Sequence, residues 1–172
     1  ALRVELRYLV NSLVTPEAKG MIRTLFNSMQ ALSKGGNRPQ GFAKSDPKKV
    51  AVLGAGMMGA GVAYVQAMAG IETILLDRDQ ASADKGKQHV KDLLDKAVAK
   101  GRMDAAKAEA VLALVTATPD YSQIKGADLI IEAVFEDKQV KAEAIKKAEA
   151  FLDPTSFFGS NTSTLPITEL AQ

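Results

Sequence analysis

The sequence predicts an α/β protein, a doubly wound parallel sheet preceded by an α-helical linker segment, and three observations predict it. From Lys49 onward, short apolar runs of strand length alternate with stretches of helical length, which is typical of a parallel sheet covered on both faces. The first of these runs leads directly into a glycine-rich stretch, Gly54–Gly59. The second ends at an acidic residue, Asp77.

The composition is that of a globular protein with one core and an appendage. Its 172 residues are 47% hydrophobic and 24% charged, and the formal net charge is only +2, which gives no reason to expect nucleic acid as a partner. The sequence has no cysteine and a single histidine, His89. Disulfides, thiol nucleophiles and a polyhistidine metal site within one chain are therefore excluded, and we expect no metal.

The charge is unevenly distributed along the chain. Residues 1–48 hold eight Lys and Arg against three Asp and Glu, whereas residues 49–172 hold fourteen against seventeen. A basic segment followed by a slightly acidic body indicates two units. We expect a helical linker segment over residues 1–46 and a nucleotide-binding domain over residues 47–172.

Residues 1–33 are predicted to form an amphipathic pair of helices. Apolar residues recur at helical spacing on both sides of Thr15-Pro16, and these two residues are the expected N-cap and first position of the second helix. The segment Lys34–Lys49 is rich in Gly, Pro and Lys and is expected to be a linker. Because the helices are basic, a membrane-surface role is conceivable, but we favour packing on a neighbouring domain.

The remaining elements follow from the same patterns. We expect strands at 50–53, at the run that ends with Asp77, within 114–120, at 127–134 and at 155–161. We expect helices over 57–69, about 79–101, about 104–114, 137–152 and from 165 onward. In the 137–152 helix, the residues predicted to point inward are Val140, Ile145, Ala148 and Leu152.

The run Val50–Ile71 has no charged side chain and could be mistaken for a membrane span. Its 22 residues include five glycines, which would make a spanning helix weak. Read as strand, turn and helix, the run has the form G-x-G-x-x-G at the junction, the pattern of Rossmann-type dinucleotide-binding domains. Gly54 permits the sharp turn, Gly56 lets the backbone approach a pyrophosphate, and Gly59 lets the helix pack closely on the strand.

Asp77 lies 23 residues after Gly54, at the end of the second predicted strand. An acid about 20 residues after the glycine turn is the expected partner of the adenosine ribose hydroxyls. A carboxylate there would repel the 2′-phosphate of NADP and therefore favours NAD. Arg78, the next residue, is a signal in the other direction, because an arginine at this place can bind that phosphate.

Four stretches together resemble the NAD-binding domain of L-3-hydroxyacyl-CoA dehydrogenases. They are VAVLGAGMMGAGVAYVQAMAG, ILLDRD, ADLIIEAVFEDKQVKAEAI and FFGSNTSTLPITELA. The upstream LVNSLVTPEAKGMIRTLF is similar to the linker of the multifunctional fatty-acid oxidation proteins, in which an enoyl-CoA hydratase domain comes first. The family often has a second serine after SNTS, where this chain has Thr164, so a hydroxyl is kept.

The resemblance implies a set of cofactor and substrate contacts. The glycine loop, with Met57 and the backbone of Met58, would contact the NAD pyrophosphate, and Asp77 the adenosine ribose. Near the nicotinamide the resemblance places Val134, Phe135, Glu136 and Lys141, with Lys141 reaching the nicotinamide ribose. Asn161 and Ser163 would lie beside the nicotinamide and the substrate's 3-hydroxyl, as the catalytic residues of this chain.

The family uses a histidine base, oriented by a glutamate, in a segment that follows SNTS. We therefore expect the catalytic base and the helical domain that binds 3-hydroxyacyl-CoA to lie beyond Gln172, and His89 to be an ordinary helix residue. The resemblance further implies an upstream hydratase domain, a possible thiolase subunit and, in a bacterium, a cytoplasmic location. A dinucleotide sensor or scaffold and another hydroxyacid dehydrogenase on this fold remain as alternatives.

Several of these residues also have purely structural interpretations. Glu136 and Asp137 suit a helix N-terminus, where the helix dipole favours acids. Lys141 could be an ordinary solvated lysine one turn into that helix. Ser163 and Thr164 are good N-caps for the last helix, a role compatible with substrate contact.

Overall fold

The computed structural model describes residues 2–171 and divides into two compact units, Ala1–Ser45 and Asp46–Gln172. Residues 1 and 172, the outermost residues of the two expected domains, lie outside the described part. Among residues 2–171, no helix is both long enough and apolar enough to cross a membrane.

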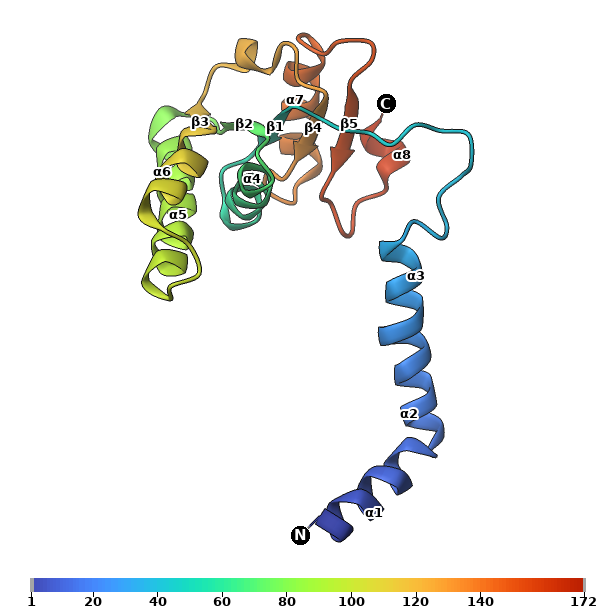
Figure 1. Ribbon diagram of the computed structural model, residues 1–172. Coiled ribbons are helices and arrows are strands. Elements are labelled where there is room, and N and C mark those ends of the chain that lie inside the picture. The colour runs from blue at the N-terminus through green and yellow to red at the C-terminus, as the bar shows by residue number, and fades with distance from the viewer. Residues whose placement is uncertain (1, 172) are drawn as a thin grey trace. The chain divides into compact units, whose positions relative to one another are not determined.

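The second unit is built on one sheet of five parallel strands, which confirms the predicted parallel sheet (Figure 1). The strands lie in the order β3-β2-β1-β4-β5. The strands are β1 Lys49–Leu53, β2 Glu72–Leu76, β3 Val115–Thr118, β4 Leu129–Glu132 and β5 Phe157–Ser160. The chain runs outward from β1 to β3 and then returns to β4 on the other side of β1. The strand order therefore reverses between β1 and β4, where parallel sheets of this kind bind ligands at the carboxyl ends of their strands.

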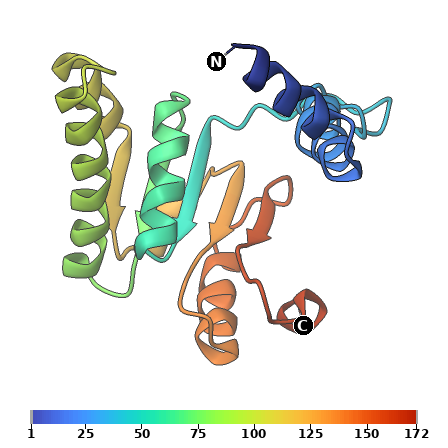
Figure 2. The same ribbon diagram turned by 90° about the horizontal axis from the view of Figure 1, so that it is seen from below.

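Helices cover both faces of the sheet (Figures 1 and 2). One face packs against α4 Met57–Met68, α5 Gln80–Ala99 and α6 Ala105–Ala113. The other packs against the 3₁₀ turn η2 Tyr121–Ile124 and α7 Lys138–Glu149. Alternate residues of β1 serve the two cores: Val50 and Val52 lie in the first, Ala51 and Leu53 in the second. Because β1 is buried on both faces, the residues that begin the uncharged run Val50–Ile71 are all apolar.

Aspartates begin three of these helices, which fixes where they start. The side chains of Asp79, Asp104 and Asp137 are the N-caps of α5, α6 and α7, and each accepts a hydrogen bond from an amide in the first turn. Such caps satisfy helix N–H groups that have no partner within the helix. The interpretation of Asp137 as a helix-start acid is thus confirmed.

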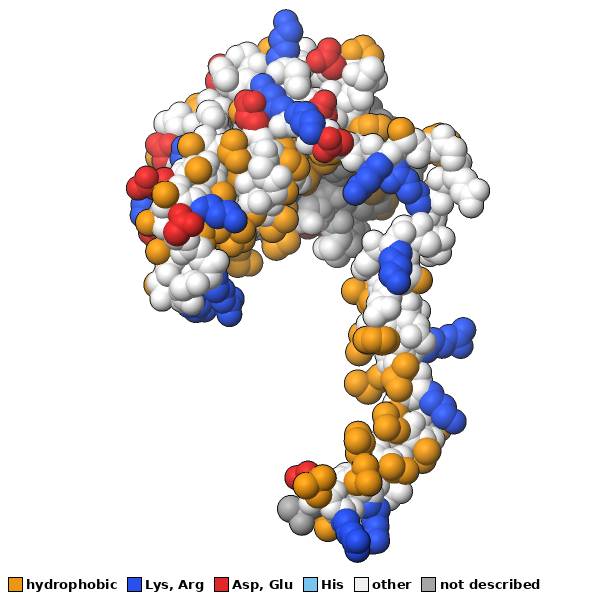
Figure 3. Space-filling view, viewed as in Figure 1, with side chains coloured by type: hydrophobic (Ala, Val, Ile, Leu, Met, Phe, Trp, Pro, Cys, Tyr) orange, Lys and Arg blue, Asp and Glu red, His pale blue; other side chains and the backbone are white. Residues whose placement is uncertain are grey.

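The first unit is helical, and it differs in detail from the predicted pair. It comprises α1 Leu2–Leu13, α2 Pro16–Met21, a π-helical stretch Ile22–Ser28 and α3 Met29–Ser33. The break is where the sequence predicts it, because the Thr15 hydroxyl accepts a hydrogen bond from the Ala18 amide and caps α2. Its large apolar side chains are exposed and gather along one side of the helices (Figure 3).

Two local predictions are wrong. In α7, Val140 is 43% exposed, so the prediction that it points inward is wrong, and Lys141 and Ala144 are buried instead. The predicted inward positions of Ala148 and Leu152 are confirmed, because Ala148 is buried and Leu152 packs against the second core. The short final helix α8, Ile167–Leu170, has Pro166 as its N-cap and no side-chain cap, so neither Ser163 nor Thr164 caps it. Both differences have one physical cause, a set of polar contacts around Glu136 and Lys141 that the next section describes.

Candidate functional site

A large hollow in the second unit lies at the carboxyl ends of the strands, where the strand order reverses. It has a volume of about 950 Å³. Its walls come from the turn after β1, the end of β2, the segment after β3, the loop after β4 and one side of α7. The lining residues are Gly54, Gly56, Met57, Met58, Asp77, Arg78, Ser82, Pro119, Tyr121, Ala133, Val134, Phe135, Val140, Glu143, Ala144 and Lys147. We call this hollow the switch-point cleft.

Each glycine of the turn meets a different steric demand. Gly54 has φ +96°, and a Cβ there would lie 2.6 Å from the carbonyl oxygen of Ala133. A Cβ on Gly59 would lie 1.7 Å from the carbonyl oxygen of Gly54, so only glycine lets α4 pack against the turn. Gly56 lines the cleft, and a Cβ there would meet no atom within 4 Å. The bare backbone at Gly56 is therefore open to a ligand in the cleft.

The first turn of α4 has the features of an anion-binding site. Its N-cap is Gly56, and no side chain caps the helix there. The first amides of a helix have no partner within it and carry a partial positive charge. Because Gly56, Met57 and Met58 also line the cleft, this helix start could hold an anionic group of a cofactor.

Asp77 follows β2 and faces the cleft from the other side of the turn. One of its carboxylate oxygens, Oδ2, accepts a hydrogen bond of 2.8 Å from the Ala55 amide, and Oδ1 accepts one of 2.7 Å from the Arg78 amide. Each oxygen can accept a second hydrogen bond. Asp77 therefore braces the glycine turn and still has acceptor capacity for ribose hydroxyls. The Arg78 side chain instead donates to Asp79 at 3.0 Å.

Tyr121 is a cleft residue that sequence reasoning missed. It lines the cleft from the η2 turn, beyond Asp77. Burial, and secondly the negative charge of Asp77, raise the pKa of the Tyr121 hydroxyl. The neutral phenol is thereby favoured at the end of the cleft that holds Asp77.

The segment after β4 forms the opposite wall of the cleft. Val134 and Phe135 line it, and Phe135 is 79% exposed. The next residue, Glu136, turns its carboxylate toward the segment after β5. Its Oε1 accepts hydrogen bonds from the Thr162 hydroxyl at 2.6 Å and from the Ser163 amide at 3.1 Å. The hydrogen bond from Thr162, and next that from Lys141, lower the pKa of Glu136 from 4.5 to about 2.

Lys141 is buried, with 1% of its side chain exposed, so the interpretation of a solvated lysine is wrong. Its Nζ lies 2.8 Å from Oε1 of Glu132 and 3.1 Å from Oε2 of Glu136. It also donates to the carbonyl oxygen of Val134 at 3.4 Å. These anionic partners explain why α7 turns a lysine, rather than Val140, toward the sheet.

The expected catalytic residues lie on the segment that follows β5. The Asn161 amide donates to the carbonyl oxygen of Glu132 at 2.8 Å, and the Ser163 amide donates to Glu136. Both side chains are exposed and neither lines the switch-point cleft. Gly59, Glu136 and Lys141 do not line it either, and they act on its shape by packing and hydrogen bonding.

Two further supporting residues were missed, and each has a signal in the sequence. Glu132 is an acid in the otherwise apolar run Leu129–Ala133, and it is fully buried. Gly86 is a glycine in the middle of α5, a position where glycine lowers helix stability. A Cβ on Gly86 would lie 2.5 Å from Cβ of Ala55, so the glycine lets α5 approach the glycine turn.

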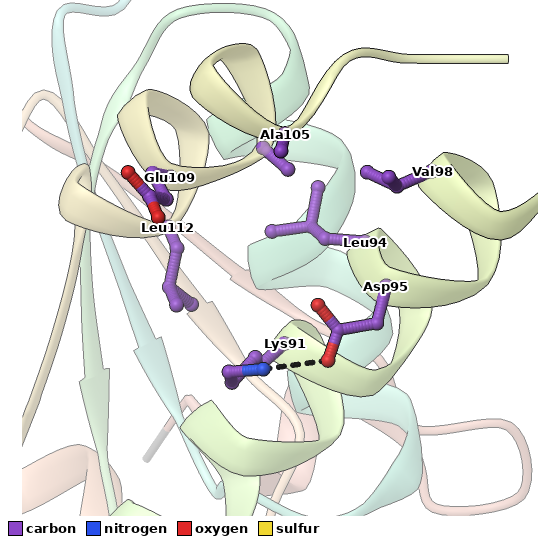
Figure 4. A pocket seen from close by; sticks show the side chains of 8 residues that line it. Lys91, Leu94, Asp95, Val98, Ala105, Glu109 and Leu112 are labelled. Atoms are coloured by element: carbon purple, nitrogen blue, oxygen red, sulfur yellow. Dashed lines mark hydrogen bonds and ion pairs between the residues drawn. The ribbon is translucent and has the colours of Figure 1, made fainter. Parts of the chain in front are cut away.

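A second, smaller cavity of about 140 Å³ lies between α5 and α6 (Figure 4). Leu94, Val98 and Leu112 are among its lining residues, and Lys91 pairs with Asp95 at its edge at 2.6 Å. It shares no residue with the switch-point cleft, and His89 lines neither. Within residues 2–171, no group of three or more His, Cys, Asp or Glu side chains could hold a metal ion.

The sequence matches the family model described as 3-hydroxyacyl-CoA dehydrogenase, NAD binding domain, over residues 49–172. That span contains the glycine turn, Asp77, the segment after β4 and the segment after β5. The family description agrees with the chemistry of the cleft, which offers a bare helix start to a diphosphate and a carboxylate to a ribose.

Solved structures of similar proteins lead to the same family. FadB2 of M. tuberculosis is 34% identical, with a TM-score of 0.71, and the match covers 74% of this chain and 45% of that one. The (S)-3-hydroxybutyryl-CoA dehydrogenase PaaH1 of Ralstonia eutropha is 30% identical, with a TM-score of 0.70, over 73% and 44%. The dehydrogenase part of multifunctional enzyme 1 of C. elegans is 31% identical, with a TM-score of 0.64, over 74% and 29%. The chain thus spans less than half of each of these proteins.

Proposed function

The chain belongs to the 3-hydroxyacyl-CoA dehydrogenase family, as its NAD-binding domain, and on that premise we propose that it serves the oxidation of 3-hydroxyacyl-CoA to 3-ketoacyl-CoA. The observation that carries the proposal is the pairing of the glycine turn with Asp77 at one cleft. The two are joined by the 2.8 Å hydrogen bond from the Ala55 amide to the Asp77 carboxylate.

We propose one orientation for NAD in the cleft. The first turn of α4 would hold the pyrophosphate, because Gly56 has no Cβ and the amides at the start of the helix have no partner within it. Met57 and Met58 would contact the pyrophosphate beside Gly56. Asp77 would accept hydrogen bonds from the adenosine ribose, with Tyr121 at the same end of the cleft. The nicotinamide half would then extend toward the segment after β4.

The nicotinamide side would be held by the residues around β4 and β5. Val134 and Phe135 would contact the nicotinamide ring, and Glu136 and Lys141 its ribose. We propose that Asn161 and Ser163 orient the C3 hydroxyl of the substrate. Support comes from the 3.1 Å hydrogen bond between the Ser163 amide and Glu136, which joins the two segments.

NAD supplies the hydride acceptor when bound, and the chain supplies orientation. The hydroxyl proton must also leave, which requires a general base. In this chain the one histidine, His89, lines neither cavity. We therefore propose that the base is contributed outside these 172 residues, together with the surface that binds 3-hydroxyacyl-CoA.

We place the parent protein among the multifunctional enzymes of fatty-acid β-oxidation, with an upstream enoyl-CoA hydratase domain and a thiolase subunit as partner. Support comes from the likeness of the upstream helices to the linker of those proteins and from the similarity to the C. elegans enzyme. In a bacterium we propose a cytoplasmic location, where NAD is available.

Isothermal titration of the 172-residue chain with NAD and with NADP tests the proposal. We expect NAD to bind, NADP to bind more weakly, and 3-hydroxybutyryl-CoA oxidation by the chain alone to be negligible. Absence of NAD binding would contradict the proposed site. Dehydrogenase activity at ordinary rates would contradict the proposal that the base lies elsewhere.

A further inference from the structure

An acidic side chain lies in the core beside the switch-point cleft. Glu132 is the last residue of β4, between Leu53 of β1 and Ser160 of β5, and it is fully buried. Removing a carboxylate from water costs several kcal/mol unless an opposite charge and hydrogen bonds compensate it. The ion pair and the hydrogen bonds of the Glu132 carboxylate therefore show which segments it holds in place.

The Glu132 carboxylate accepts from three different segments. Oε1 accepts from Lys141 Nζ of α7 and from the Val134 amide after β4, both at 2.8 Å. Oε2 accepts a short hydrogen bond from the Ser160 hydroxyl of β5. The Ser160 hydroxyl oxygen in turn accepts from the Thr162 amide at 3.2 Å. Glu132 thus joins α7 to the segments that follow β4 and β5.

The contacts continue from Glu132 to the proposed catalytic segment. Lys141, held by Glu132, also lies 3.1 Å from Glu136, and Glu136 accepts from the Thr162 hydroxyl and the Ser163 amide. Two routes therefore lead from Glu132 to residues 162–163, one through Ser160 and one through Lys141. Glu132 itself does not line the cleft, so any effect it has on a ligand must pass through these neighbouring residues.

Stability alone is a poor reason for this arrangement. Apolar side chains that replace a buried ion pair often leave a protein equally stable or make it more stable. The ion pair fixes the position of the lysine ammonium, which would otherwise move freely at the end of a flexible side chain. The benefit is therefore expected in the placement of Lys141.

We propose that Glu132 is a positioning residue for the nicotinamide half of NAD. It acts through Lys141, by fixing the ammonium of that residue beside the segment after β4, from where the proposed function has it reach the nicotinamide ribose. The inference rests on the proposed function, in which Lys141 contacts that ribose.

The test separates the two halves of the coenzyme. NAD and ADP are titrated calorimetrically into the 172-residue chain and into Glu132→Gln, Lys141→Met and the double variant. ADP carries the adenosine and both phosphates but lacks the nicotinamide ribose, so it reports on the glycine turn and Asp77 only. Glu149→Gln, an exposed acid near the end of α7, is the matched control. Circular dichroism checks that each variant is folded.

We expect Glu132→Gln and Lys141→Met each to weaken NAD binding by about tenfold to a hundredfold, the range for a lost charge-assisted hydrogen bond. ADP affinity should stay within about twofold in both, and the double variant should bind NAD no more weakly than Lys141→Met. Unchanged NAD affinity in Glu132→Gln, or a parallel loss of NAD and ADP affinity, would overturn the inference.

A second comparison applies if Glu132→Gln alone does not fold. The double variant has no unpaired buried charge at either position, and its NAD affinity is compared with that of Lys141→Met. Equal affinities support action through Lys141, and a further loss in the double variant overturns it. Failure of the unaltered chain to bind NAD would instead refute the proposed function itself.

Discussion

Asp77 both supports the glycine turn and lines the switch-point cleft. Its carboxylate accepts from the Ala55 amide, which holds the glycine turn against the end of β2. The same carboxylate lines the cleft and has acceptor capacity for ribose hydroxyls. Its removal is therefore expected to affect both the ligand contact and the turn that carries the pyrophosphate.

Asp77→Ala should weaken NAD binding by roughly tenfold to a hundredfold, because charge-assisted hydrogen bonds to the ribose are lost. Isothermal titration with NAD measures the change. Asp95→Ala is the control, since Asp95 forms only an exposed pair with Lys91 on α5. An Asp77→Ala variant that binds NAD as tightly as the unaltered chain would contradict the ribose contact.

Glu136 makes the segment after β5 sensitive to acid. Its pKa is about 2 in the folded protein against 4.5 ordinarily, chiefly because of the hydrogen bond from Thr162. A lowered folded pKa means that the charged form stabilises the fold, fully above about pH 4.5 and less and less as the pH falls toward 2. Glu136→Gln removes this contribution at every pH.

Urea unfolding of the unaltered chain and of Glu136→Gln at several pH values between 2 and 7 checks this. The variant should be the less stable of the two above pH 5, and the difference in unfolding free energy should shrink between pH 4.5 and 2. Taking the difference cancels the titration of the other acids. A difference that does not change with pH would count against the assignment.

At the scale of the element, α4 shows how one helix carries two glycines with opposite constraints. A Cβ on Gly59 would lie 1.7 Å from the Gly54 carbonyl oxygen, whereas a Cβ on Gly61 would meet no atom within 4 Å. Helix propensity treats the two positions alike. Only the packing of α4 against the turn after β1 distinguishes them.

Gly59→Ala should therefore destabilise the fold by about 1–3 kcal/mol, as overpacking does, and weaken NAD binding by displacing the glycine turn. Gly61→Ala should stabilise it by about 0.5–1 kcal/mol, because alanine is favoured over glycine within a helix. Urea unfolding and NAD titration of both variants measure the contrast. Equal effects of the two substitutions would show that the turn does not constrain α4.

At the scale of the whole molecule, every residue that lines the switch-point cleft belongs to the unit Asp46–Gln172. The helical unit Ala1–Ser45 has large exposed apolar side chains, among them Leu2, Leu25 and Phe26. The expectation that this apolar side packs on a neighbouring domain stays a prediction, as does the domain boundary at residue 46.

A chain that lacks residues 1–45 should bind NAD within about twofold of the unaltered affinity. The reason is that the remaining unit contains both cores of the sheet and all the lining residues of the cleft. Isothermal titration, with circular dichroism to confirm folding, makes the comparison. A large loss of NAD affinity in the shortened chain would mean that the helical unit contributes to the site.

Much of the fold could be predicted from the residues because each element carries a local signal. The turn at Gly54–Gly59, the helix-start acid Asp137 and the apolar strands each follow from a few neighbouring residues. The strand between Ala127 and Val134 was predicted too long, because β4 ends at Glu132, where the chain turns out toward the cleft. The roles of the site residues stay predictions until NAD binding is measured.

What the sequence by itself determined is the order of strands and helices, the bare turn for a diphosphate, the acid at Asp77 and the resemblance to the family. What only the tertiary structure decided is the inward face of α7 and the burial of Glu132 and Lys141. The physical reason is that apolar periodicity cannot show which side of a helix is buried when a lysine on that side is neutralised. The neutralising carboxylate comes from β4, nine residues earlier, and only folding brings it within 2.8 Å of the lysine.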